Sequence, residues 1–218
     1  MEDSSMSSEF RFSIKKTDTL RNQIYQDIKD AVIGGQLKPG QRLREQDLSK
    51  DMGVSRGPIR EAILLLEREG LLVTQTHRET TVANVEKREV EELLNPLRVL
   101  LESYCIQTIL PRLNESHFAD LENILNELIE ACQKMDMSAI VKKDLQFHEY
   151  LVSLTEEPYM ISLWSGVASR IVFHFMNNSH MHQQNDFSQL IEEHRELLNA
   201  IKTKDWGVIE PVLRKHIY

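Results

Sequence analysis

The 218-residue sequence predicts a mainly α fold, in which three helices and a β-hairpin are followed by an antiparallel bundle of about six helices. Apolar residues recur at helical spacing along most of the chain. Two β-branched runs, at 71–74 and 80–85, flank a polar tip, whereas no convincing strand follows residue 86. With 41% hydrophobic and 28% charged residues, the chain has the composition of a soluble protein with one large domain or two small ones.

The sequence argues against membrane, secreted and disulfide-rich classes of protein. It has no run of about 18 apolar residues, so we expect no membrane span. Residues 1–10 are acidic and serine-rich rather than basic and then apolar, which argues against a signal peptide, and residues 1–18 are expected to be disordered. The two cysteines, Cys105 and Cys132, lie in sequence of helical character, so we expect no disulfide scaffold and a cytoplasmic location.

The first part of the chain has the order of elements of a winged helix-turn-helix. A helical apolar stripe covers 19–33 and ends at two glycines, and a short helix over about 45–52 follows a Pro-Gly turn. Ser55 can N-cap a longer helix that ends at Gly70. The hairpin would then form the wing. We therefore expect a winged helix-turn-helix domain over 19–85, with an inert small domain of the same topology as the alternative.

Arginines at the start of the longer helix indicate a nucleic-acid partner. Arg56 and Arg60 are four residues apart, hence about 40° apart around the helix axis, so both can project from one face into a major groove. Arg44, just before the short helix, can hold a phosphate. Taken singly, each arginine could equally be an ordinary solvated surface residue.

The distribution of charge along the chain supports the same division. The formal net charge of -8 at first argues against a nucleic-acid partner. Residues 1–80, however, carry 13 basic and 13 acidic residues, and residues 11–60 carry 11 basic and 6 acidic ones. The whole negative charge therefore belongs to the remainder of the chain, with ordinary fluctuation of surface charge as the alternative.

The acidic remainder, residues 86–218, is expected to form the helix bundle. Asn114 can cap its second helix, Pro158 can open the fourth and Asp205 can cap the last. Pro96 should kink the first helix or split it after residue 94. The predicted helices cover about 87–110, 115–134, 138–155, 158–180, 187–203 and 206–218.

Four residues of the bundle form a candidate metal site. Asp144 and His148 lie at positions i and i+4 of one predicted helix, so their side chains can share one cation, although a simple hydrogen bond is the alternative. An antiparallel bundle can bring His194 and His216 against them. Three histidines and one carboxylate suit zinc, nickel or manganese and leave a position for a ligand carboxylate. The other histidines are better explained as surface or core residues: His77, His117, His174, His180 and His182.

Three stretches of the first domain follow a specific pattern: Ile-Gly-Gly-Gln-Leu-Lys-Pro-Gly-Gln-Arg-Leu over 33–43, Val-Ser-Arg-Gly-Pro-Ile-Arg-Glu-Ala over 54–62 and Leu-Glu-Arg-Glu-Gly-Leu over 66–71. In this pattern the chain resembles the GntR family of bacterial transcription regulators. The resemblance implies a recognition helix that opens with Val-Ser-Arg and a wing that reaches the adjacent minor groove. The positions that it assigns to the DNA interface are Arg44, Ser55, Arg56, Gly57, Arg60, Thr76, His77 and Arg78.

Two positions depart from the family pattern. Gly57 stands where threonine is common, which removes a hydroxyl that could bind a phosphate or a base edge. Glu79 stands near where a wing glycine is usual, which adds a negative charge beside DNA and a less permissive backbone. The departures bear on the operator sequence and the wing geometry rather than on DNA binding itself.

The bundle has a second pattern: Asp-Leu-Gln-Phe-His over 144–148, Glu-His-Arg-Glu-Leu-Leu-Asn-Ala-Ile over 193–201 with Lys-Asp at 204–205, then His216, together with an Arg-x-x-x-Glu pair at 98–102. It resembles the FCD-type effector domain of the FadR subgroup of GntR regulators, so that the resemblance covers about 19–218. A Glu-Pro at 157–158 replaces the common Asn-Pro turn. The metal ligands that the resemblance implies are Asp144, His148, His194 and His216.

Two arginines are candidates for binding an anionic effector in that domain. The resemblance implies that Arg98 lies in the wall of an effector pocket. Arg170 lies on the helix that should cross the pocket, with a surface salt bridge as the alternative. Together these residues predict that a small metabolite, a carboxylic acid, binds at the metal.

We therefore expect a ligand-responsive transcription regulator, not an enzyme. A homodimer would present two recognition helices to a palindromic operator in double-stranded DNA, and repression relieved by the effector is the commoner family pattern. The first alternative is a metal-dependent enzyme fused to a DNA-binding module, against which stands the lack of a general base at informative spacing or a nucleophile motif. The second is a regulator whose metal is purely structural.

Overall fold

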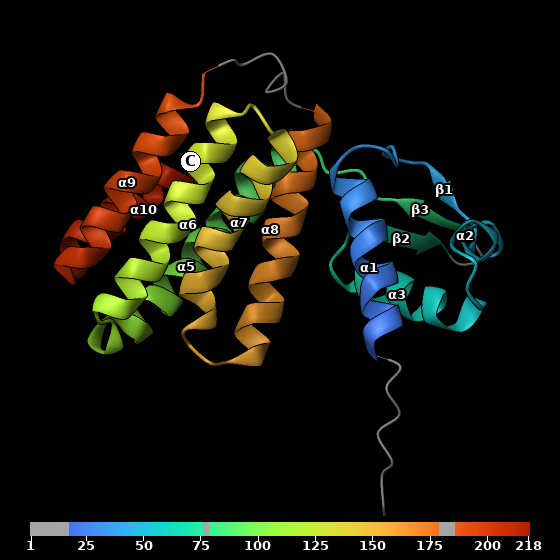
Figure 1. Cartoon of the computed structure of the whole chain (residues 1–218), viewed down its shortest axis with the longest axis horizontal. Coiled ribbons are helices and arrows are strands. Elements are labelled where there is room, and N and C mark those ends of the chain that lie inside the picture. The colour runs from blue at the N-terminus through green and yellow to red at the C-terminus, as the bar shows by residue number, and fades with distance from the viewer. Residues whose placement is uncertain (1–17, 76–78, 179–185) are drawn as a thin grey trace, which may run out of the picture.

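The computed structural model describes residues 18–75, 79–178 and 186–218. These residues form two units that lie side by side, a small N-terminal unit with a sheet and a larger helix bundle (Figure 1). The mainly α fold class predicted from the sequence is confirmed. The expected disordered start lies, up to residue 17, outside the described residues.

The N-terminal unit is built on three helices, α1 (Asp18–Ile33), α2 (Glu45–Met52) and α3 (Arg56–Arg68). Ile24, Ile28 and Val32 recur at helical spacing on α1 and are fully buried, because this stripe faces the apolar side of α3. Helix α2 ends at Gly53, whose φ of 65° is the left-handed conformation that glycine adopts readily. The turn that follows it leads directly into α3.

A three-stranded antiparallel sheet closes this unit, in the order β1 (Arg42–Leu43), β3 (Glu79–Val82) and β2 (Leu72–Gln75). The hairpin of β2 and β3 was expected, and its register places Val73 opposite Thr81. Strand β1 was not expected, because a two-residue strand carries no alternation that a sequence pattern can reveal. It pairs with β3 through Arg42 and Thr81.

The bundle begins with an interrupted helix. Helix α4 (Lys87–Glu89) continues into a π-helical turn at Val90–Leu94, and α5 (Asn95–Ile109) follows. Pro96 closely follows the π-helical turn, and the backbone at Leu94 and Asn95 stays helical, so the irregularity expected near Pro96 takes the form of this turn rather than a split after residue 94. A short 3-10 turn at Leu110–Arg112 ends this segment.

The remaining helices pack beside α5 (Figure 1). Four of them share a large apolar core with α5, whereas α8 packs on α5 and α7 through a smaller cluster that includes Trp164 and Ala168. Asn114 and Asp205 cap α6 and α10 with side-chain acceptors, as predicted, and Asn114 forms a full capping box with His117. Asp136 caps α7. The five helices are α6 (Glu115–Gln133), α7 (Met137–Ser153), α8 (Pro158–Asn178), α9 (Ser188–Thr203) and α10 (Trp206–Ile217).

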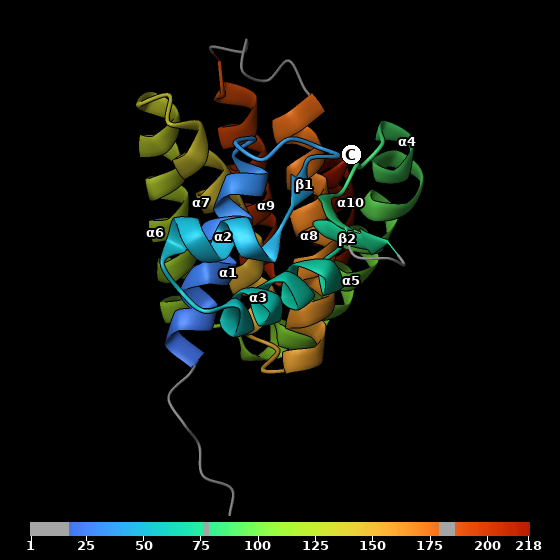
Figure 2. The same cartoon turned by 90° about the vertical axis from the view of Figure 1, so that its right-hand side faces the viewer.

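Helix α8 belongs to the bundle but also completes the core of the N-terminal unit, which faces the viewer in Figure 2. Ile171 and Phe173 of α8 are buried in one apolar cluster with residues of α1 and α3. Three residues of α8 add polar contacts: Ser169 with Glu69, Arg170 with Gly70 and with Glu89 of α4, and His174 with Val85. Val90 and Leu94 of the π-helical turn are buried in the same cluster, so α8 and this turn together join the two units.

None of the helices in the described part of the chain has both the length and the apolar character needed to cross a membrane.

Candidate metal centre and nucleic-acid interface

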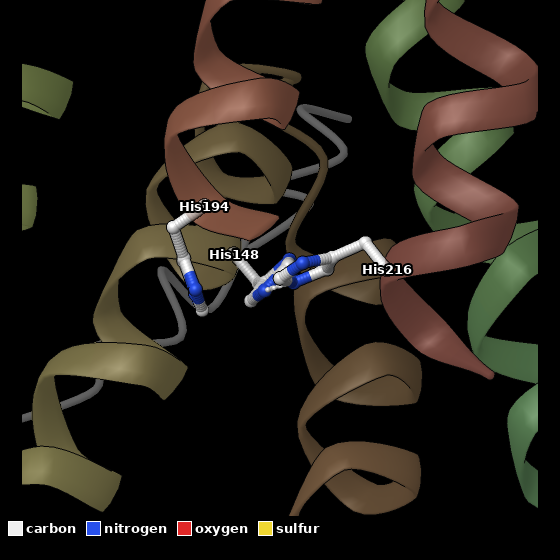
Figure 3. Close-up of side chains that lie close together, drawn as sticks. All are labelled: His148, His194 and His216. Carbon is white, nitrogen blue, oxygen red and sulfur yellow. Dashed lines mark hydrogen bonds between the residues drawn. The ribbon is translucent and has the colours of Figure 1, made fainter. Parts of the chain in front are cut away.

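Three histidines from three helices meet inside the bundle (Figure 3). They are His148 of α7, His194 of α9 and His216 of α10, and one ring nitrogen of each lies within 4.8 Å of the others. His148 and His194 are 0% exposed. The helices thus bring together residues that are far apart in the sequence, and each contributes one nitrogen donor.

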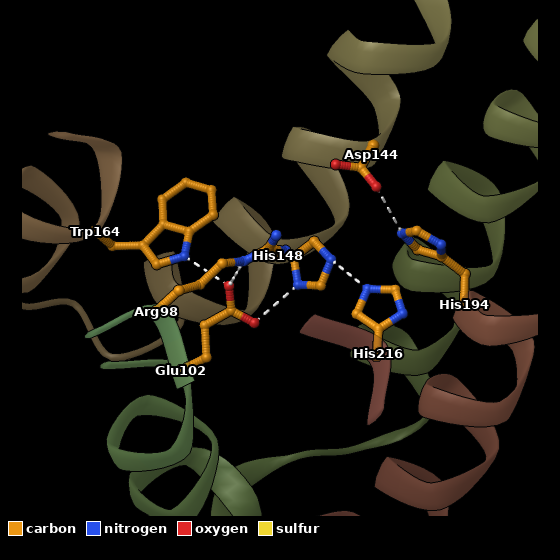
Figure 4. A network of polar contacts seen from close by, with 7 residues as sticks. All are labelled: Arg98, Glu102, Asp144, His148, Trp164, His194 and His216. Carbon is orange, nitrogen blue, oxygen red and sulfur yellow. Dashed lines mark hydrogen bonds and ion pairs between the residues drawn. The ribbon is translucent and has the colours of Figure 1, made fainter. Parts of the chain in front are cut away.

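Asp144 lies one turn before His148 on α7 and adjoins the same cluster (Figure 4). Its Oδ1 lies 3.2 Å from His194 Nε2, a contact at ion-pair distance that lacks the geometry of a hydrogen bond. His216 Nε2 lies 2.9 Å from His148 Nε2. The four side chains predicted as metal ligands are therefore neighbours in the fold.

The outer nitrogens of two histidines are held by acceptors. His148 Nδ1 lies 2.9 Å from Glu102 Oε2, and His194 Nδ1 lies 2.8 Å from the Leu190 carbonyl oxygen. Because a carboxylate and a carbonyl only accept, each Nδ1 must carry the proton and donate it. A neutral ring protonated on Nδ1 directs the lone pair of its Nε2 away from this bond, here into the cluster.

This donor set fits a divalent transition metal. One ring nitrogen each of His148, His194 and His216 lies within 4.8 Å of the others, and among the described residues the Asp144 carboxylate adjoins this group through His194 Nε2 alone. His194 Nε2 is buried and has no hydrogen-bond partner among the described residues, so its lone pair is free to coordinate a metal ion. Imidazole nitrogens with one carboxylate are the ligands that zinc, nickel and similar ions prefer.

The buried environment keeps the ligands in the protonation state that a metal needs. Burial lowers the pKa of His148, and it lowers the pKa of His216 well below its usual range, so both rings stay neutral. Burial opposes ionisation of Asp144, but positive charge at the neighbouring His194 holds the pKa of that carboxyl below its usual range, and a metal ion on His194 Nε2 would supply such a charge. Neutral imidazoles and an ionised carboxylate are the ligating forms.

A buried polar network extends from the histidines to α5 and α8 (Figure 4). Glu102 accepts from Arg98 Nε at 2.7 Å and from Trp164 Nε1 at 2.8 Å, in addition to His148. Burial opposes ionisation of Glu102, but Arg98 and His148 hold its pKa below the usual range. Arg98 Nη2 is buried without a hydrogen-bond partner among the described residues, so its guanidinium retains a donor for an anion beside the cluster.

The predicted DNA face lies at the far end of the N-terminal unit. Arg44, Arg56 and Arg60 line one surface hollow between α2, α3 and the sheet. The side chains of Arg56 and Arg60 are 61% and 59% exposed. Both contact Glu45, which lies in the first turn of α2. The structure thus brings together the three arginines that the sequence predicts as DNA contacts.

The other positions predicted for the DNA face have different surroundings in the structure. Ser55 is the N-cap residue of α3, without a capping hydrogen bond from its side chain. Gly57 has open space where a side chain would begin. Glu79, a departure from the family pattern, pairs with Arg42 at 2.9 Å, which offsets its charge. Three predicted positions of the wing lie outside the described residues: Thr76, His77 and Arg78.

Comparison with known proteins matches both units. Residues 20–82 match the gntR family of bacterial regulatory proteins, and residues 94–218 match the FCD domain. The chain belongs to the GntR family and carries an FCD domain.

Relatives of this GntR regulator are transcription regulators from other bacteria. It is 28% identical to the HTH-type transcriptional regulator McbR of Escherichia coli (strain K12) over 193 residues, which cover 86% of this chain and 84% of McbR. It is 24% identical to the gluconate operon transcriptional repressor of Bacillus subtilis (strain 168) over 182 residues, or 82% of this chain and 74% of the repressor. The solved structure of E. coli McbR/YncC matches with a TM-score of 0.77 at 26% identity, and covers 91% of this chain and 93% of that one.

These relatives confirm a DNA-binding transcription regulator and not an enzyme. The alternative of a metal-dependent enzyme therefore has no support from them.

Arg170 of the GntR regulator does not join the histidine cluster. Its Nε donates to Glu89 at 3.1 Å and its Nη1 donates to the Gly70 carbonyl, where the N-terminal unit meets α8. Gly70 has a φ of 67°, and a Cβ there would lie 2.7 Å from Arg170 Nη1, so the corner after α3 requires glycine. The predicted effector contact thus lies instead at the boundary of the two units.

Sequence patterns did not assign several residues of the site a role. Glu102 was recognised as part of an Arg-x-x-x-Glu pair, but its bond to His148 joins residues 46 positions apart. Trp164 and Leu190, whose carbonyl contacts His194, belong to no sequence pattern that pointed to the site. Glu45 precedes the recognition helix by 11 residues, and only the packing of α2 on α3 reveals its contact with Arg56.

Proposed function

We propose that this GntR regulator is a homodimeric repressor that binds a palindromic operator and is released by a small carboxylate bound at a divalent metal. The metal ligands would be Asp144, His148, His194 and His216. The observation that carries the proposal is the group of three histidine nitrogens within 4.8 Å of one another, with the Asp144 carboxylate 3.2 Å from one of them and a buried Arg98 Nη2 that has no hydrogen-bond partner among the described residues. As a regulator of bacterial genes, the protein would act in the cytoplasm.

The chemistry of the site favours an anionic effector. A transition metal bound by these residues would supply a Lewis-acidic position for a carboxylate oxygen. Arg98 would donate from Nη2 to the same ligand, because its Nε is already held by Glu102. A guanidinium fixed in this way recognises a carboxylate with little loss of side-chain entropy.

Helix α8 offers a physical route from this site to DNA. Trp164 of α8 donates to Glu102, which in turn fixes His148. Ten residues on, in the same helix, His174 lies 2.6 Å from the Val85 carbonyl, and between them Arg170 holds the corner that follows the recognition helix. An effector that prefers one position of α8 would therefore bias the placement of α3.

The direction of control is proposed from the relatives. The gluconate operon protein of Bacillus subtilis and RspR of Escherichia coli are both named repressors. Release of the operator by the effector is then the response we expect of this chain.

Genomic selection tests the proposal most directly. Purified metal-loaded protein would be used to recover genomic fragments, and a carboxylate library would then be screened for compounds that change the protein's affinity for the recovered operator. Failure to enrich any sequence would contradict operator binding. Saturating libraries that change neither operator affinity nor thermal stability would leave a purely structural metal as the better explanation.

Replacement of Arg60 by alanine should weaken operator binding by about 1–3 kcal/mol, because a base contact from the recognition helix is lost. Titration of the protein against the recovered operator by fluorescence anisotropy measures the change. Arg195→Ala in the bundle removes an equivalent charge far from α3 and should leave affinity unchanged. Unaltered binding of both Arg56→Ala and Arg60→Ala would contradict the assigned recognition helix.

An exposed apolar stripe supports dimerisation through the bundle. Leu93, Leu97, Leu100 and Tyr104 follow one another at spacings of four, three and four residues on the π-helical turn and α5, and all are exposed. This spacing is that of a helix–helix seam, and a second copy would present the same stripe for a two-fold interface. The two recognition helices would then face the two halves of a palindrome.

Leu100→Glu should convert the dimer to a monomer in analytical ultracentrifugation, because it places a charge in the centre of the stripe, where Leu100 is 65% exposed. Val208→Glu on α10, another exposed apolar position, is the matched control and should remain dimeric. A dimer that persists in Leu100→Glu at the same concentration would place the interface elsewhere.

A further inference from the structure

The carboxylate of Glu45 accepts hydrogen bonds from two arginines of the predicted DNA face, Arg56 and Arg60. Glu45 Oε1 and Oε2 accept from Arg60 Nε and Nη2, each at 2.8 Å, and Oε2 also accepts from Arg56 Nη2 at 3.2 Å. The Glu45 side chain is 25% exposed, whereas the side chains of Arg56 and Arg60 are 61% and 59% exposed. Glu45 therefore lies behind the arginines and holds them from the protein side.

The way in which Arg60 is held leaves a defined set of donors for DNA. A guanidinium has five N–H groups in one plane, and the bond to Glu45 uses the side formed by Nε and Nη2. The end of the group, formed by Nη1 and the second hydrogen of Nη2, remains available. Two parallel donors of this kind match the O6 and N7 acceptors of guanine in the major groove.

The carboxylate is itself fixed relative to the recognition helix. Glu45 lies in the first turn of α2, where the helix dipole favours a negative charge. Its pKa is lowered, chiefly by the hydrogen bond from Arg60, so it is ionised at neutral pH. Ser49 Oγ donates to the Val54 carbonyl at 2.6 Å and ties α2 to the turn before α3.

We propose that Glu45 is a positioning residue for operator recognition. It orients Arg60 and Arg56 for contacts with bases and disfavours their binding to phosphates instead. The second effect follows from charge, because a carboxylate beside two guanidiniums repels the DNA backbone wherever base contacts do not compensate. Glu45 thus sets the ratio of operator affinity to non-operator affinity. This inference depends on the proposed base contacts of Arg56 and Arg60.

The test compares affinity for the recovered operator with affinity for a scrambled duplex of the same length and composition. Glu45→Gln keeps the size of the side chain but loses the charge and one acceptor oxygen. We expect non-operator binding to strengthen and the ratio of affinities to fall by about tenfold. Asp47→Asn is the matched control, because it removes one charge from an exposed position on the same helical turn. It should shift both affinities alike and keep the ratio within about twofold.

A second measurement separates positioning from a merely structural effect. Selection from a pool of randomised operators should show that Glu45→Gln loses base preference at the same base pairs as Arg60→Ala. In an Arg60→Ala background, Glu45→Gln should change the ratio much less than in the wild type, because its main partner is gone.

The outcomes separate failure of this inference from failure of the recognition helix. A Glu45→Gln ratio equal to that of Asp47→Asn would overturn the inference, as would an undiminished effect of Glu45→Gln in the Arg60→Ala background. If Arg56→Ala and Arg60→Ala both retained the wild-type ratio, the assignment of the recognition helix would fail, and the inference with it.

Discussion

Replacement of His194 by alanine should strip the bound metal from the purified protein and make its melting temperature insensitive to chelators. His194 supplies a fully buried Nε2 that faces Asp144, and its tautomer is fixed by the Leu190 carbonyl. Loss of one nitrogen from a three-histidine set leaves two rings and a carboxylate, and it opens a cavity beside them. Both effects disfavour metal retention.

The size of the stability effect follows from mass action. A metal present at a thousand times its dissociation constant stabilises the folded state by about 4 kcal/mol. In a chain of this length, this corresponds to roughly 10 °C in melting temperature. The wild type should lose that stabilisation when a chelator is added, whereas His194→Ala should melt at one temperature with or without it.

Elemental analysis after dialysis provides the direct measurement. His117→Ala is the matched control for metal occupancy, because His117 is a partly buried histidine at the start of α6, remote from the cluster in sequence. The variant loses a bond of the α6 capping box but no predicted ligand, so it should retain full metal occupancy. Full stoichiometry in both His148→Ala and His194→Ala would place the metal elsewhere. Analysis of the wild type would also identify the metal.

Local chemistry made the course of the chain largely predictable from the sequence. Asn114 and Asp205 cap the helices that they were expected to cap, and Pro158 opens α8, because each acts on backbone groups within a few residues of itself. The pair Asp144 and His148 was likewise readable, since a spacing of four residues places two side chains on one helix face.

Contacts between distant segments could not be predicted in this way. An antiparallel bundle made His194 and His216 possible partners of that pair, but only the family resemblance singled them out, because no spacing rule relates three separate helices. Arg170 was expected at the effector site because of its helix. It lies one residue from Ser169 and three from Phe173, and like them it contacts the N-terminal unit. The orientation of α8 is determined by its packing against the neighbouring helices, which local sequence patterns do not reveal.

Arg170→Ala should uncouple effector binding from DNA binding. In this structure the arginine donates from Nη2 to Glu89 at 2.5 Å and from Nη1 to the Gly70 carbonyl, so a guanidinium of α8 contacts the corner after the recognition helix, beside the hydrogen bond from Ser169 to Glu69. A hydrogen bond to a charged group contributes about 1.5–3 kcal/mol. Typical coupling between an effector and its partner site is about 1–3 kcal/mol, so the loss of this contact is enough to remove most of it.

The expected result separates coupling from binding. The carboxylate that raises the melting temperature of the wild type should do so equally in Arg170→Ala, because the histidine cluster and Arg98 are unchanged. Its effect on operator affinity, measured by anisotropy with and without the compound, should shrink toward none. Amide hydrogens around Gly70 should also exchange faster in the variant, since the contact that holds this corner is absent.

The choice of control decides what the result means for α8. Arg195→Ala on α9 removes an arginine whose partner, Glu192, lies within the same helix, so it should leave the coupling at its wild-type value. If Arg170→Ala responded to the effector as strongly as Arg195→Ala, the signal would have to travel by another path, such as a rearrangement of the dimer. Since coupling is reciprocal, operator DNA should likewise lower effector affinity in the wild type and in Arg195→Ala, but much less in Arg170→Ala.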